Sequence, residues 1–165
     1  MARVPAWKSQ AVDLRNRMGC AMDYKPWTRK QRHFQGLHML PRPLEVVELA
    51  AIAHVGPPPQ KQHGRMRQLL RDVFVDVSQN PVRQPWTNKS MISPCLTTST
   101  VLYCFERDRV VLPLELMCWQ GHKADIIVPA TMSQSSLRDL AGQGICLPCL
   151  AMLIGAAAGC GAFQK

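Results

Sequence analysis

Residues 137–159 read LRDLAGQGICLPCLAMLIGAAAG, and this stretch contains the apolar C-terminal run of the chain. Its first part has the apolar period of a helix, and a glycine-rich turn follows. The apolar run at 145–158 is 14 residues long and contains Pro148 and Gly155. A bilayer span needs about 20 predominantly apolar residues, so we predict a buried core helix here and not a membrane anchor. Its inward-facing residues are expected to be Leu147, Leu150, Ala151, Ile154 and Ala158.

Upstream of this stretch, short helices and strands alternate along the chain. Pro113 and Gly121 flank one expected helix, in the usual positions of proline and glycine at helix ends. Ser133 or Ser135 can cap another. These alternating elements predict the fold class α/β, in the form of a mixed α+β fragment with short strands and a C-terminal apolar helix. Apolar periodicity places helices at 44–52, 62–73 and 114–120, and strands at 74–78 and 100–105.

The net charge of +9 is concentrated near the N-terminus, where residues 1–40 hold eight basic and two acidic side chains. Such an excess attracts polyanions, because phosphate contacts by Lys and Arg release counterions. A solvated basic tail would show the same excess. Residues 1–35 have neither helical nor strand periodicity, which indicates a mobile arm or a loosely packed lead-in. We therefore expect a basic arm at 1–42, with disorder as one possibility, and a folded module at 43–165.

The seven cysteines are an odd number at irregular spacing, and no signal peptide opens the sequence. This indicates reduced thiols in an intracellular compartment, nuclear or cytoplasmic. Cys146 and Cys149 form the one close pair, without further ligands at zinc-finger spacing, so no metal site is expected. One hypothesis is a small zinc or redox protein built on this pair, and two others follow below.

Three short segments together carry a resemblance to a known family. Residues 93–99 read SPCLTTS, 109–115 read RVVLPLE and 119–122 read WQGH. In order and spacing they resemble the first of two late blocks of the DNA cytosine-5 methyltransferases. That block reads roughly Ser-Pro-x-Leu-Thr-Thr-Ser, Arg-x-Leu-Thr-Pro-x-Glu and Leu-Gln-Gly-Phe. Residues 137–151 resemble the final block, a Gly-Asn-(Ser/Ala)-Val-x-x-Pro turn that leads into an apolar helix.

The resemblance implies the incomplete C-terminal portion of a methyltransferase-like fold. In that family the turn of the final block folds onto the N-terminal half and closes the pocket for S-adenosylmethionine. The implied cofactor contacts here are Gln143, Gly144 and Ile145, with Gln143 in place of the family's asparagine. Gly142 and Gly144 suit this role because glycine permits unusual φ values and close backbone approach. The resemblance implies that residues 97–99 support the recognition region and are not catalytic.

Methyl transfer to cytosine requires three blocks that are absent from the sequence: a Pro-Cys-Gln loop, a Glu-Asn-Val segment and a Phe-x-Gly-x-Gly turn. Cys95 and Cys149 each follow a proline, yet neither has a neighbouring Lys, Arg or His to stabilise a thiolate. We therefore assign no catalytic residue. The chain is expected to be a terminal fragment or a degenerate relative of the family, inactive alone, whose catalytic half lies on another chain, is lost, or was never part of this gene product.

DNA is the second expected partner. In the N-terminal region, basic side chains alternate with Trp27 and Phe34, a pattern that suits phosphate contact combined with base stacking. Arg83 sits where the family often carries an arginine. The alternative is a non-catalytic interaction protein, whose uncharged segment at 140–164 docks into a larger assembly or membrane complex. The candidate DNA-binding residues are Lys25, Arg29, Lys30, Arg32 and Arg83.

Overall fold

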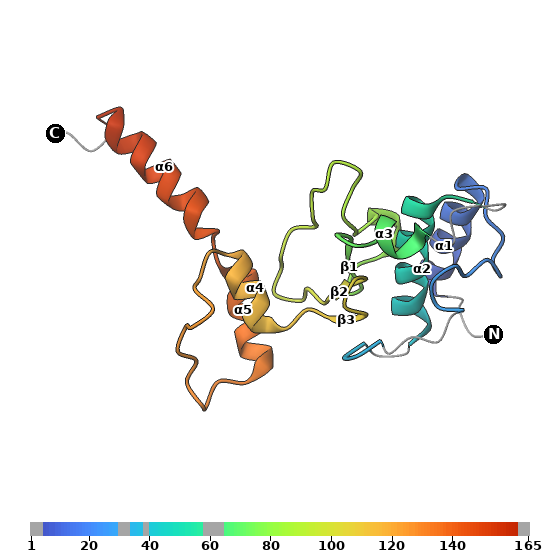
Figure 1. Cartoon of the computed structure of the whole chain (residues 1–165), viewed down its shortest axis with the longest axis horizontal. Coiled ribbons are helices and arrows are strands. Elements are labelled where there is room, and N and C mark those ends of the chain that lie inside the picture. Colours follow the sequence, from blue (N-terminus) through green and yellow to red (C-terminus); the bar gives the residue numbers. More distant parts are fainter. Residues whose placement is uncertain (1–4, 30–33, 38–39, 58–64, 162–165) are drawn as a thin grey trace. The chain divides into compact units, whose positions relative to one another are not determined.

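The computed structural model describes residues 5–29, 34–37, 40–57 and 65–161. The chain is a mixed α and β protein, as predicted (Figure 1). It divides into two compact units, the first formed by 1–95 with 100–111 and the second by 96–99 with 112–165. The first unit holds α1 (Ala6–Arg17), α2 (Pro41–Val55), α3 (Met66–Leu69), β1 (Phe74–Asp76), the short 3₁₀ helix η2 (Pro81–Arg83), β2 (Leu102–Cys104) and β3 (Arg109–Val110). The second unit holds α4 (Pro113–Trp119), α5 (Gln134–Gln143) and α6 (Leu147–Gly159).

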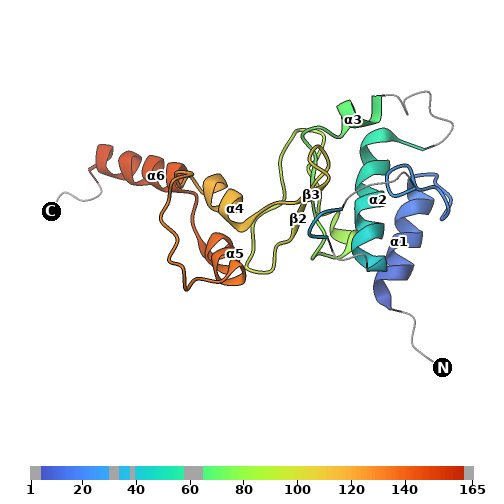
Figure 2. The same ribbon diagram turned by 60° about the horizontal axis from the view of Figure 1, so that its bottom comes forward.

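The central element of the first unit is α2. Pro41 starts the helix, where a missing backbone N–H costs nothing, and Gly56 ends it with a φ of 87°. The predicted helix at 44–52 is therefore confirmed and is longer than expected. Most of its side chains are buried, because α1 lies along it (Figure 2) and the sheet also contacts it.

The sheet is antiparallel in the order β1-β2-β3. Val75 pairs with Tyr103, and Tyr103 pairs with Val110. Both predicted strands are present and shorter than expected. Asp76, a polar residue of this alternating strand, is buried. Its carboxylate accepts hydrogen bonds from the backbone N–H and hydroxyl of Ser78 and from the backbone N–H of Val101.

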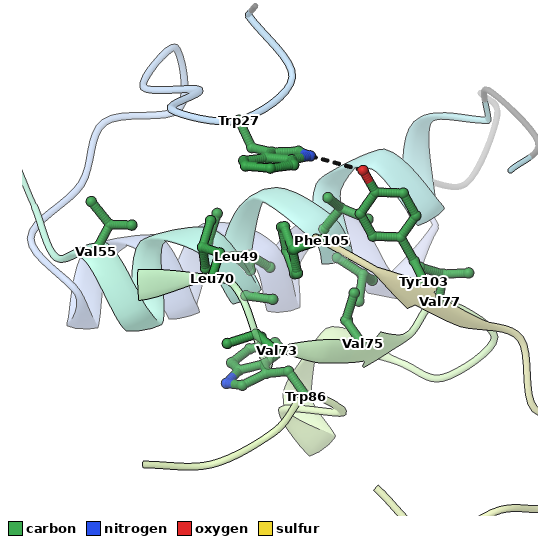
Figure 3. Packing of buried hydrophobic residues seen from close by; sticks show 14 of the residues in the cluster. Trp27, Leu49, Val55, Leu70, Val73, Val75, Val77, Trp86, Tyr103 and Phe105 are labelled. Atoms are coloured by element: carbon green, nitrogen blue, oxygen red, sulfur yellow. Dashed lines mark hydrogen bonds between the residues drawn. The ribbon is translucent and has the colours of Figure 1, made fainter. Parts of the chain in front are cut away.

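The described part of residues 1–42 is not a separate arm. Residues Ala11 and Leu14 of α1 are buried, and so is Trp27. Figure 3 shows the Trp27 indole N–H directed at the Tyr103 hydroxyl, at a distance of 3.0 Å. Sequence periodicity missed α1 because few apolar residues mark its buried face and a buried arginine completes it. The first unit therefore continues across the expected boundary at residues 42 and 43.

Candidate functional site

The second unit is built around the packing of α4 against α5. The helix at 114–120 was predicted, and α4 confirms it, with Pro113 in its first turn. Gly121 follows the helix with a φ of +91°, which favours glycine. The N-cap of α5 is Ser133, whose hydroxyl accepts the Ser136 backbone N–H at 3.0 Å. Two well-capped helices thus hold the turn that follows α5.

The turn between α5 and α6 contacts the Gln-Gly turn after α4. Gln120 donates its side-chain amide to the Ala141 carbonyl at 2.9 Å, and its own carbonyl accepts the Leu147 backbone N–H at 2.7 Å. A Cβ placed on Gly121 would enter the pyrrolidine ring of Pro148. The segments 119–122 and 137–151, which the resemblance treats as separate blocks, therefore lie against one another.

A further segment of the resemblance, residues 93–99, contacts α5 at Gly142. A Cβ on this residue would lie inside 3.0 Å of backbone atoms of Thr97 and Thr98, a separation that real Cβ atoms essentially never show. Glycine is thus needed near the C-terminal end of α5 so that the backbone at 97–98 can cross it. The close approach at Gly142 is made to the chain's own backbone, and the approach to a cofactor stays a prediction.

Gln143, Gly144 and Ile145 form the turn itself. Gln143 is the last residue of α5 and is exposed, and Ile145 is also exposed. Gly144 has a φ of −68° and a ψ of 155°, an extended conformation open to any residue, so the unusual φ expected there is not found. The turn offers the Gln143 amide and nearby backbone groups to a ligand on its open side.

The prediction that α6 is a buried helix is wrong. None of its residues is buried, and Met152 is 76 % exposed. Within the second unit, α6 leaves α4 and α5 from its first turn and extends away from them, as Figures 1 and 2 both show. By length and composition alone, Gln134–Gly159 could cross a membrane, but α6 itself has 13 residues and spans roughly 20 Å, against about 30 Å for a bilayer core.

The candidate DNA-binding residues belong to the first unit. Lys25 and Arg29 are exposed on the segment after α1, and Arg83 is exposed on η2, bonded to the Gln79 side chain at 3.1 Å. Lys30 and Arg32 lie outside the described residues. The prediction that Trp27 and Phe34 stack on bases is wrong, because both side chains are buried against Tyr103. The basic side chains can contact phosphate without them.

Sequence reasoning missed a cavity of about 470 Å³ between α1, α2 and the segment after α1. Lys8 and Lys25 border it, and so do Glu45 and Glu48 of α2. Glu45 pairs with Arg15 at 2.6 Å, and Glu48 accepts the backbone N–H groups of Trp27 and Thr28. The signal in the sequence was the presence of two glutamates within an otherwise apolar helix.

Burial raises the pKa of Glu48 above its ordinary value of 4.5, and the hydrogen bonds from Thr28 and Trp27 offset part of the rise. A carboxyl with a raised folded-state pKa stabilises the fold most below its unfolded pKa, and this contribution is lost as pH rises through the folded value. The wild type should therefore lose stability relative to Glu48→Gln as pH rises above 4.5. Urea unfolding of both proteins across this range measures the difference. A difference in stability between the two proteins that stays constant across this pH range would contradict the assignment.

No model of a known protein family matches this chain, and no curated protein matches it.

Proposed function

We propose that this chain is the C-terminal module of a DNA cytosine-5 methyltransferase-like system. In this proposal α6 docks onto a cofactor-binding half carried by another polypeptide, and residues 143–145 become one wall of its S-adenosylmethionine pocket. The observation that carries the proposal is the meeting of segments 97–98, 119–122 and 137–148 in one small unit. They belong to three of the four segments on which the resemblance rests.

The exposure of α6 supports docking. Its apolar side chains include Met152, Leu153 and Ile154, all exposed, and no charged residue occurs between positions 140 and 164. A contiguous exposed apolar surface of this kind marks an interaction site. In a methyltransferase-like arrangement this surface would be covered by the half that the sequence lacks.

The chain's own contribution to the reaction is binding and enclosure. S-adenosylmethionine, when bound, supplies the methyl group. Gln143 would offer its amide as a donor and an acceptor to the cofactor, and Ile145 would exclude water beside it. Gln120 keeps the turn in place through its bonds to Ala141 and Leu147. Lys25, Arg29 and Arg83 would add sequence-independent contacts to DNA phosphates.

A complementation experiment tests the proposal. A cytosine-5 methyltransferase truncated before its last two blocks is titrated with S-adenosylhomocysteine, alone and with this chain. The chain should tighten binding by at least about tenfold, a typical coupling between sites. Gln143→Ala should reduce this gain while leaving the two proteins associated, because it removes a cofactor contact and not the docking surface.

The docking step has a matched pair of variants. Ile154→Asp places a charge on α6 and should abolish association with the truncated enzyme. Ile127→Asp makes the same change at a loop position of the same unit that is 92 % exposed and should have no effect. Association that survives Ile154→Asp, or a folded chain that never associates, would contradict the proposal.

The exposed apolar helix also favours the second candidate, a non-catalytic assembly subunit. This candidate predicts that the chain associates with its partner through α6. It predicts that the chain does not change the affinity of the truncated enzyme for S-adenosylhomocysteine, and that Gln143→Ala has no effect. The two candidates are therefore separated by the same titration.

A further inference from the structure

Two cysteines lie together at the start of α6. Cys146 is the N-cap of the helix, and Cys149 lies three residues later in its first turn. All seven cysteines are reduced in the structure, and of this pair Cys149 is exposed and Cys146 half-buried. Their side chains are hydrogen-bonded to each other, which raises the pKa of the Cys149 thiol, and negative charge on Cys146 raises it further. The two thiols therefore lie on one turn, at the accessible start of the helix.

We propose that Cys146 and Cys149 are a redox-active dithiol that closes to an intramolecular disulfide. The spacing places both residues on the first turn of one helix, where a Cys-x-x-Cys pair can bridge without unwinding the helix. Pro148 fixes the backbone between them, since its φ is restricted to helical values. Pro148 also packs against Gly121, so the pair is held on the capped end of the second unit.

The oxidant is a low-molecular-mass disulfide such as oxidised glutathione. The Cys146 thiolate attacks one sulfur of this disulfide, which forms a mixed disulfide and releases one glutathione thiolate. Cys149 then loses its proton to solvent, and its thiolate attacks the Cys146 sulfur and releases the second glutathione. Two electrons pass from the dithiol to the oxidant, and the two protons lost by the cysteines protonate the two glutathione thiolates.

The disulfide would act on the turn that follows α5. Cys146 is two residues from Gly144, and oxidation would tie this end of the turn to the first turn of α6. The apolar side chains that we assign to docking lie further along the helix, at 152–154. Oxidation therefore leaves that surface exposed and restrains the segment at 143–145.

The test equilibrates the whole chain with mixtures of reduced and oxidised glutathione, followed by acid quenching, thiol alkylation and mass analysis. The expected product loses two hydrogen atoms at residues 146 and 149. It should exceed the mixed glutathione adduct at this pair by at least about tenfold, because the second thiol attacks at high effective concentration. Cys146→Ser and Cys149→Ser should each abolish the disulfide and accumulate the mixed adduct on the remaining cysteine.

Cys160→Ser is the matched control, since it removes an exposed thiol at the other end of the same helix. This variant should form the Cys146–Cys149 disulfide as the wild type does. Circular dichroism confirms that each variant is folded. Two mixed adducts on the wild-type pair, or a disulfide that survives either substitution at 146 or 149, would overturn the proposal.

Discussion

Arg15→Met is expected to lower the free energy of unfolding by about 3–5 kcal/mol, the cost of leaving a buried charge without its partner. Arg15 is 0 % exposed and forms a two-point ion pair with Glu45, with Nε–Oε1 at 2.6 Å and Nη2–Oε2 at 3.1 Å. Its remaining nitrogen donates to the carbonyls of Ala21 and Tyr24, at 3.1 and 2.8 Å. One guanidinium thus joins α1, α2 and the segment between them.

Methionine keeps the length of the arginine stem and removes every one of these donors. The Glu45 carboxylate is then left beside the core, and two backbone carbonyls lose their partners. Because the loss comes mainly from the orphaned charge, Arg15→Met combined with Glu45→Met should recover a large part of the stability. Urea unfolding monitored by tryptophan fluorescence reports on this unit through Trp27.

Arg71→Met provides the matched control. Arg71 pairs with Glu106 at 3.3 Å, but both side chains are at least half exposed, at 69 % and 50 %. Solvent screens such a pair, so its removal should cost no more than about 1 kcal/mol. If the two arginine substitutions destabilise equally, the guanidinium of Arg15 is not buried in the way described.

The elements that were predicted correctly are those marked by residues with one dominant backbone preference. Pro113 and Gly121 delimit α4, Ser133 caps α5, and Gly56 ends α2. In each case the residue type itself restricts φ or supplies the capping acceptor, so the signal is local. The mixed class of the fold follows from the same local signals.

Two errors concern local structure: of the helix expected at 62–73 only Met66–Leu69 is α-helical among the described residues, and Gly144 lacks the unusual φ expected there. The other errors concern burial, which depends on what the rest of the chain places beside an element. α1 was missed because its buried face is completed by Arg15, whose partner Glu45 is 30 residues away. α6 was predicted to be buried because it is apolar, yet none of its residues is buried in the structure. Trp27 and Phe34 were interpreted as stacking residues because basic residues precede and follow them, and both lie in the core.

The candidate turn was located from the sequence, but the reason for its glycines was not. Gly144 has an ordinary backbone conformation, whereas Gly142 is required by contact with Thr97 and Thr98. That contact links positions more than 40 residues apart, and no local pattern reports it. The pairing of the two segments is therefore a finding of the structure.

Gly142→Ala should test this pairing most directly, with an expected loss of about 2–3 kcal/mol in the stability of the second unit. The added methyl group would meet backbone atoms of Thr97 and Thr98, which cannot rotate away as a flexible side chain would. The better helix propensity of alanine offsets the loss by no more than about 1 kcal/mol. Thermal unfolding followed by circular dichroism, with amide exchange at 97–99, measures the effect.

Gly155→Ala makes the identical change in α6, where a Cβ would meet nothing within 4 Å. Alanine should therefore stabilise α6 by about 0.5–1 kcal/mol, through the lower conformational entropy of its unfolded chain. The two glycine variants are thus expected to change stability in opposite directions. If Gly142→Ala is as stable as the wild type, the backbone at 97–98 does not cross α5. The meeting of segments that carries the proposed function would then be lost, and the interaction-subunit alternative would remain, because it needs only the exposed apolar surface of α6.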